Sequence, residues 1–88
     1  MDERIVERTM ADSMPVSLKD DELRLDEHPL TKPPRAVAVA AWVRYGETPV
    51  RIEGRAVAWT ARAVAVEWKT PAGAVHRAWV WASAVTGV

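Results

Sequence analysis

The chain of 88 residues contains no cysteine and no phenylalanine, and its longest unbroken apolar run covers only residues 36–43. Without cysteine, neither a disulfide nor a thiolate-bound metal ion can brace the fold. The apolar run is too short to cross a bilayer as a helix, which needs about 20 residues. The first residues also lack the apolar stretch of a signal peptide. These absences predict a soluble, cytoplasmic protein without a membrane association.

Side chains suited to catalysis or to metal binding are also scarce. The only histidines, His28 and His76, are far apart in the sequence. No serine stands in a nucleophile elbow, and neither a glycine-rich phosphate loop nor a metal-ligand spacing is present. The acidic run over residues 20–22 is typical of a solvated loop rather than of a cation site. We therefore expect no enzyme, no catalytic residue, no metal and no cofactor.

The chain divides into two segments of opposite charge near residues 32–34, Lys-Pro-Pro. Residues 1–34 carry nine acidic and five basic side chains, whereas residues 35–88 carry three acidic and seven basic ones, so their net charges are −4 and +4. The first segment has no aromatic residue and few aliphatic ones, and therefore buries too little apolar surface to offset its ordering entropy. We predict an acidic arm over residues 1–34, disordered or loosely packed, and one domain over residues 35–88.

The second segment alternates apolar residues with small or polar ones, a pattern that predicts β-strands. A turn is expected over residues 46–49, and a change of phase after Gly54 predicts a bulge or a strand bend at that glycine. Residues 70–73, Thr-Pro-Ala-Gly, are typical of a tight turn and precede a strand over residues 75–82. The number and length of these strands predict an all-β, five-stranded small barrel.

The end of the chain resembles the end of an SH3-like small barrel. Residues 78–85 read Ala-Trp-Val-Trp-Ala-Ser-Ala-Val, similar to that family's pattern of small residue, aromatic, aliphatic, proline, two linker residues, aromatic and valine. Trp81 stands in place of the proline and Ala84 in place of the second aromatic. The family's opening motif and acidic loop are absent, so recognition of proline-rich peptides is not implied. The resemblance implies an SH3-like fold in which the two tryptophans face outward and the two valines face the core.

Five tryptophans are the most informative side chains of the chain. Trp59 and Trp68 are in phase with neighbouring valines, so both are predicted to belong to the core. Arg77, Trp79 and Trp81 recur at every second residue and therefore share one face of one strand. They form either a stacking platform with a cationic edge, suited to a peptide or to unpaired bases, or a cover over the end of the barrel.

Trp42 and Arg44 lie on the face of the first strand that is opposite its valines. They are either free to bind or, in the case of Trp42, covered by the arm. Arg51 and Arg55 contribute further positive charge on the following strand. The predicted binding residues are Trp79, Trp81, Arg77, Trp42, Arg44, Arg51 and Arg55.

These features predict a non-catalytic small binding module that docks on a larger protein partner through an exposed face of tryptophan and arginine. The alternative is a small barrel that binds nucleic acid, with arginines on phosphates and tryptophans on bases. In that alternative the tethered acidic arm competes with the nucleic acid for the basic domain.

Overall fold

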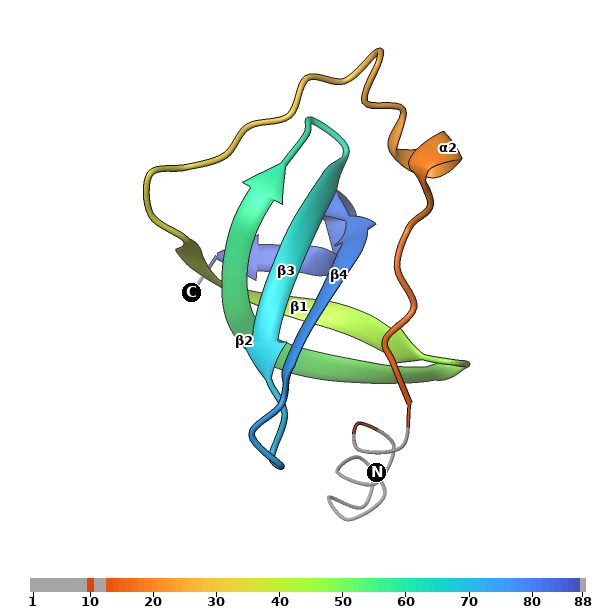
Figure 1. Cartoon of the computed structure of the whole chain (residues 1–88), viewed down its shortest axis with the longest axis vertical. Helices are drawn as coiled ribbons and strands as arrows, with labels where there is room; N and C mark the ends of the chain where they lie inside the picture. Colours follow the sequence, from red (N-terminus) through yellow and green to blue (C-terminus); the bar gives the residue numbers. More distant parts are fainter. Residues whose placement is uncertain (1–9, 11–12, 88) are drawn as a thin grey trace.

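Five β-strands form one antiparallel sheet in the computed structural model, which describes Met10 and residues 13–87. The order of the strands in the sheet is β4-β3-β2-β1-β5. The sheet curls on itself, which confirms the predicted all-β, five-stranded, barrel-like fold (Figure 1). The elements are α2 (Asp20–Leu23), β1 (Val37–Tyr45), β2 (Thr48–Trp59), β3 (Ala63–Lys69), β4 (Val75–Trp81), the 3-10 helix η1 (Ala82–Ala84) and β5 (Val85–Gly87).

The long strand β2 joins the two halves of the sheet. It pairs with β1 from Thr48 to Ala56 and with β3 from Arg55 to Trp59. Figure 1 shows β2 bending strongly between these two partners. The bend brings β4 into contact with β1, although the two strands are not hydrogen-bonded neighbours in the sheet. A gap therefore remains between the backbones of β1 and β4, and side chains of both strands line it.

Gly54 lies where β2 and β3 approach most closely. A Cβ atom at this position would stand 3.0 Å from Trp68 Cβ and would collide with the Glu67 carbonyl oxygen, so only glycine leaves room for the bent strand. Of the two alternatives expected at Gly54, the bulge is not present there, because β1 pairs with β2 without a break through this residue, whereas β2 does bend along its length (Figure 1). The register shift lies between Ala56 and Ala58, in the pairing with β3.

The two faces of β2 explain why the sequence pattern misplaced the bulge. Ala56 and Ala58 are buried in phase with the inward residues at the start of the strand. Val57 and Trp59 are half-buried on the opposite face. The arm pairs with the end of β2 at Thr31, which exchanges backbone hydrogen bonds of 2.7 and 2.9 Å with Trp59. Trp59 is thus packed against the margin of the core rather than inside it.

The two predicted turns are both present. The turn expected over residues 46–49 is confined to Gly46 and Glu47. Gly46 has a φ of 62°, a left-handed conformation that glycine adopts without a steric cost. The turn over residues 70–73 is confirmed, and Gly73 donates its amide hydrogen across 2.9 Å to the carbonyl of the first residue in the turn.

The core fills the space inside the curled sheet, with Val43 and Val66 almost fully buried at its centre. Trp68 is 3% exposed and is a core residue, as predicted. Its Nε1–H donates to Tyr45 Oη across 3.1 Å, and a hydrogen bond of 2.7 Å joins Tyr45 Oη to His76 Nδ1. Burial of its hydroxyl raises the pKa of Tyr45. This network gives partners to polar atoms that would otherwise be costly to bury.

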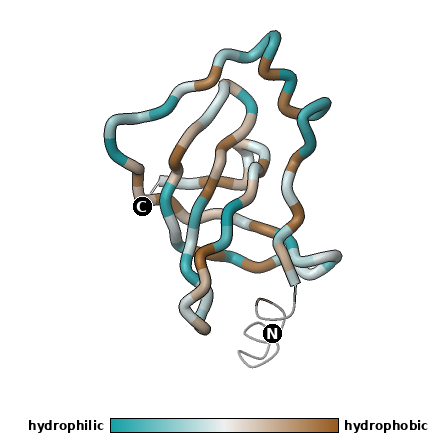
Figure 2. The backbone as a smooth tube through the Cα atoms, in the orientation of Figure 1, coloured by the Kyte–Doolittle hydropathy of each residue, from teal (hydrophilic) through white to brown (hydrophobic). Residues whose placement is uncertain are grey.

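The arm lies along the sheet instead of extending away from it. It passes beside β4, over the connection between β2 and β3, and down the other side to β1 (Figure 1). Apart from α2 and the bridge at Thr31, residues 13–34 are irregular and mostly exposed, as expected of a loosely packed arm. Figure 2 shows only isolated hydrophobic stretches along it. Met10 is buried in the core cluster; for residues 1–9, 11 and 12 the prediction lies outside the described part of the chain.

Candidate functional site

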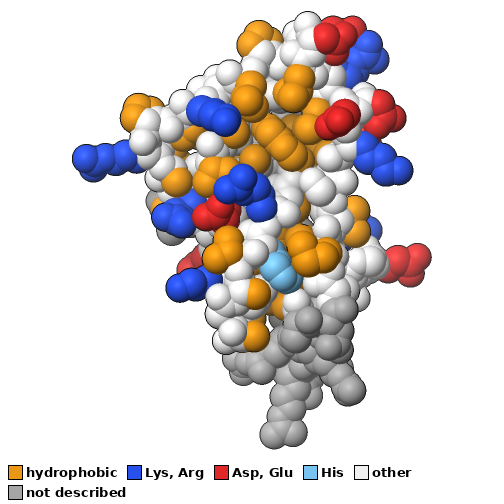
Figure 3. Space-filling model, viewed as in Figure 1, with side chains coloured by type: hydrophobic (Ala, Val, Ile, Leu, Met, Phe, Trp, Pro, Cys, Tyr) orange, Lys and Arg blue, Asp and Glu red, His pale blue; other side chains and the backbone are white. Residues whose placement is uncertain are grey.

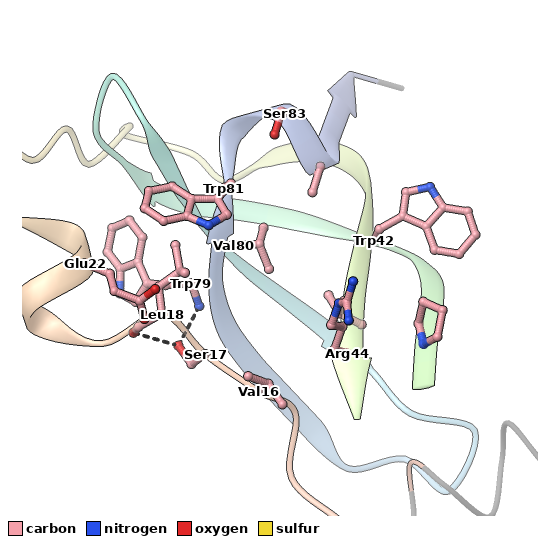
Figure 4. A pocket seen from close by; sticks show the side chains of 13 residues that line it. Val16, Ser17, Leu18, Glu22, Trp42, Arg44, Trp79, Val80, Trp81 and Ser83 are labelled. Carbon is pink, nitrogen blue, oxygen red and sulfur yellow. Dashed lines mark hydrogen bonds between the residues drawn. The ribbon is translucent and has the colours of Figure 1, made fainter. Parts of the chain in front are cut away.

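A groove of about 550 Å³ occupies the gap between β1 and β4, and we call it the Trp groove (Figure 4). Residues 42–44 of β1 and 79–81 of β4 form its sides. Arm residues 16–18 and Glu22 form a third wall, and η1 closes one end. The groove exists because β1 and β4 are brought together by the curl of the sheet but do not pair through their backbones.

Two of the predicted tryptophans lie at opposite margins of the Trp groove, Trp42 on β1 and Trp81 on β4 (Figure 4). Trp42 is 54% exposed and Trp81 is 43% exposed, although their strand neighbours Val43 and Val80 are buried. Alternation along each strand sends the valine inward and the tryptophan outward. The described part of the arm leaves Trp42 largely exposed, so both indoles offer a large apolar surface to a partner.

Trp79 is half-buried because the arm crosses β4 at this residue. The Trp79 amide donates to Ser17 Oγ across 2.8 Å, and the Leu18 amide donates to the Trp79 carbonyl across 3.0 Å. Further back in the arm, the Val16 amide donates across 2.7 Å to the carbonyl of Arg44 at the end of β1. The arm therefore bridges β4 and β1 and forms part of the wall of the groove.

The groove carries one cation and one anion among its described lining residues, Arg44 and Glu22. Glu22 Oε1 accepts a hydrogen bond of 3.1 Å from the Lys19 amide, which caps α2. Arg44 is exposed, and it forms no ion pair with any residue that the structure describes. The guanidinium is therefore an uncompensated positive charge beside the two exposed rings.

The other predicted arginines do not line the Trp groove. Arg51 stands opposite Trp42 in the β1–β2 ladder and extends the outer face of that hairpin. Arg77 and Arg55 both pair with Glu67, at N–O distances of 2.6 and 3.1 Å. The hydrogen bond from Arg77, together with both positive charges, holds the pKa of Glu67 below its ordinary value. Figure 3 shows lysine and arginine side chains spread over the face in view rather than gathered in one patch.

Sequence reasoning did not predict the contribution of the arm to the site. Val16, Ser17 and Leu18 supply backbone and hydroxyl groups to the wall of the groove. The only signal in the sequence is that two aliphatic residues flank a serine. An alternation of three residues is too short to indicate a strand-like segment.

Neither a metal-binding cluster nor a membrane-spanning helix is found among the described residues. No group of three or more His, Cys, Asp or Glu side chains in that part of the chain could hold a metal ion. His76 is enclosed in the core, and His28 Nε2 lies 3.4 Å from Arg62 Nη1, outside the groove. Over the same residues, no helix is long and apolar enough to span a membrane.

Comparisons with known proteins assign the chain to no family. A scan against protein-family models and searches of curated proteins and of solved structures found no match. The SH3-like resemblance therefore stays a prediction, and the function has to be argued from the geometry of the groove.

Proposed function

We propose that this chain is a non-catalytic binding module that holds a segment of a larger protein partner in the Trp groove. The observation that carries the proposal is the position of Trp42 and Trp81, both exposed, on opposite margins of one groove. Tryptophan is among the residues that most often supply a large share of the binding energy in protein interfaces. An indole that is exposed in the isolated chain contributes the most binding free energy when a partner buries it.

The charges around the groove favour a polypeptide over a nucleic acid. Nucleic-acid binding depends on cations that track the phosphate backbone. In this protein Arg55 and Arg77 share the carboxylate of Glu67, away from the groove. The groove itself offers one cation, Arg44, and also contains the anion Glu22, which is too little positive charge to follow a phosphate backbone. The two exposed indoles, the one cation and the one anion of the groove together give it a mixed apolar and charged composition, which is typical of protein interfaces.

The same lining residues support a role without catalysis. Glu22 and Arg44 are the only acidic or basic side chains among the described residues that line the groove. A guanidinium stays protonated in proteins and therefore cannot act as a general base. General acid–base catalysis by a single exposed carboxylate, without a positioned partner, would be inefficient.

The proposal is tested by selecting peptides from a displayed random library against the immobilised full-length chain. Synthetic copies of the selected peptides are then titrated and followed by fluorescence anisotropy. Trp81→Ala is expected to weaken their binding by about 2 kcal/mol or more, which is roughly thirtyfold in affinity. Trp42→Ala is expected to weaken it in the same direction.

Val75→Ala is the matched control, because Val75 is an apolar residue of β4 that is 58% exposed and lies outside the Trp groove. Urea unfolding of each variant tests whether the barrel still folds. Selected peptides that bind equally well to both tryptophan variants would overturn the assignment. Binding of a single-stranded oligonucleotide at low salt, with no peptide selected, would favour the nucleic-acid alternative.

A further inference from the structure

β4 is an edge strand of the sheet, and the backbone groups on its outer edge need partners. Trp79 directs its amide and carbonyl away from β3, because both are hydrogen-bonded to the arm. Residues two apart in an antiparallel strand direct their backbone groups to the same side. The amide and carbonyl of Arg77 therefore point to the same outer edge, and neither has a hydrogen-bond partner within the described residues.

The arm fills this edge only in part. Leu18 donates its backbone amide to the Trp79 carbonyl, but the Trp79 amide meets the side-chain hydroxyl of Ser17 in place of a backbone carbonyl. A paired strand would satisfy both backbone groups of Trp79 and both of Arg77. Val16 is 51% exposed and Leu18 is half-buried, so displacing residues 16–18 exposes mainly part of one leucine side chain. Leu23, which is 4% exposed, lies outside the displaced segment.

Side chains of an added strand would find space on both faces of β4. On the inward face of β4, that of Val80, the outer edge of the strand borders the Trp groove, whose lining also includes Trp79 and Trp81 from the opposite face. A second hollow of about 350 Å³ lies on the face of Arg77 and is also lined by Leu30 of the arm and Val57 of β2. Trp79 lines both. Since the side chains of a strand alternate between faces, an added strand would place every second side chain in each space.

The charge beside the edge points to the chemistry of the partner. Arg44 lines the Trp groove and has no ion-pair partner in the described part of the chain. Glu22 is already engaged with the Lys19 amide. An acidic side chain on a bound segment would therefore find an unoccupied guanidinium in the groove, and a bidentate pair between the two adds geometric specificity.

We infer that the partner segment is an extended polypeptide that adds to the outer edge of β4 in place of arm residues 16–18, with an acidic side chain directed at Arg44. The inference rests on the proposed function and names the conformation and charge of the segment. In this mode of recognition, backbone hydrogen bonds supply affinity and the pockets for alternate side chains supply specificity. The arm is tethered close to the same edge and acts as an intramolecular competitor.

The first test uses the full chain and the tightest peptide from the selection described above. Hydrogen exchange of individual amides is measured by NMR with and without the peptide. Exchange of the Arg77 amide is expected to slow by about tenfold or more, because binding gives it a partner. The amide of Ala72, in an exposed turn, serves as the control and should not change.

The second test is a scan in which each peptide bond of that peptide is N-methylated in turn. Because a strand directs alternate amides to its neighbour, methylation is expected to abolish binding at every second residue and to be tolerated between them. Arg44→Glu is expected to weaken a peptide that carries an acidic residue. Replacing that acidic residue with lysine should restore binding to the Arg44→Glu chain.

The third test loosens the arm. Leu18→Pro removes the amide that donates to Trp79, and Ser17→Ala removes the hydroxyl that accepts from it. Each change is expected to raise peptide affinity several-fold, whereas Thr86→Ala, which removes a hydroxyl from an exposed residue of β5 outside the groove, should not raise it. If both arm variants lowered peptide affinity, the arm would be part of the binding surface and its role as competitor would be overturned.

The outcomes separate the inference from the proposed function. If no peptide is selected, the proposed function fails and the inference fails with it. If a peptide depends on Trp81 but leaves Arg77 exchange unchanged and shows no two-residue period in the methyl scan, the proposed function stands and the inference is overturned.

Discussion

Replacing Gly54 with alanine adds one methyl group at the closest approach of β2 and β3. The new Cβ would stand 3.0 Å from Trp68 Cβ and 3.2 Å from the carbonyl carbon of Glu67. Carbon atoms in contact are separated by about 3.5–4.0 Å, so the two strands would have to move apart by roughly 0.5–1 Å. Neither neighbouring atom is the end of a flexible side chain. We expect the overpacking to cost about 1–3 kcal/mol of unfolding free energy, and hence to lower the melting temperature by roughly 5–20 °C.

Gly87→Ala is the matched control, because it adds the same methyl group to a strand residue with no atom within 4 Å of the new Cβ. Its unfolding free energy is expected to lie within about 0.5 kcal/mol of the unchanged protein. Urea unfolding followed by tryptophan fluorescence measures both variants under the same conditions. If Gly54→Ala unfolds at the same urea concentration as Gly87→Ala, the close approach of β2 and β3 does not limit the residue at this position and the reasoning is refuted.

Three further predictions concern the buried network and the surface ion pairs. Tyr45→Phe leaves Trp68 Nε1 and His76 Nδ1 without their shared partner, and should cost about 1–3 kcal/mol in urea unfolding; unchanged stability would contradict this. Because burial raises the pKa of Tyr45 above 10.0, the folded state holds the phenol proton more tightly than the unfolded chain does. Stability should therefore be complete below pH 10 and fall as the pH rises through the raised pKa, and the fall should be smaller in Tyr45→Phe. Because Arg77 lowers the pKa of Glu67 below 4.5, the contribution of this carboxylate should be present above that pH and lost as the pH falls through the lowered pKa. Urea midpoints of Glu67→Gln across the acidic range should lack this loss, and an unchanged pH profile would show that the ion pair does not contribute.

The arm is attached to the sheet at separate places, which include the end of β2 and the edge of β4. Its bridge from Thr31 to Trp59 pairs with the end of β2, whereas its bonds at Trp79 occupy the edge where we place the partner. The first contact lies close to the start of β1 and the second lies further back in the chain. The arm can therefore leave β4 while its last residues stay attached to β2.

The period-two pattern of the sequence was sufficient to predict the strands and the direction of most side chains. Val80 faces inward while Trp79 and Trp81 face outward because adjacent residues in a pleated strand alternate between faces. This property is local, so the face of each side chain can be predicted from the sequence of one strand without knowledge of the neighbouring strands. The turn over residues 70–73 was predictable for the same reason, since its proline and glycine restrict only their own backbone.

The tertiary structure alone decided which of these outward residues meet. Trp42 and Trp81 share a groove because the bend in β2 brings β1 against β4. The two residues are far apart in the sequence, so the alternation within either strand does not predict that they meet. Arg77 is paired with Glu67 because of the cross-strand register of β3 and β4, which moves its charge away from the groove. The apolar residues Val57 and Trp59 suggested a change of phase, but both stay half-buried on the outer face of β2 while Ala56 and Ala58 keep the inward phase. Alternation determines the face on which a side chain lies, whereas its neighbours depend on how the sheet curls and on what covers it.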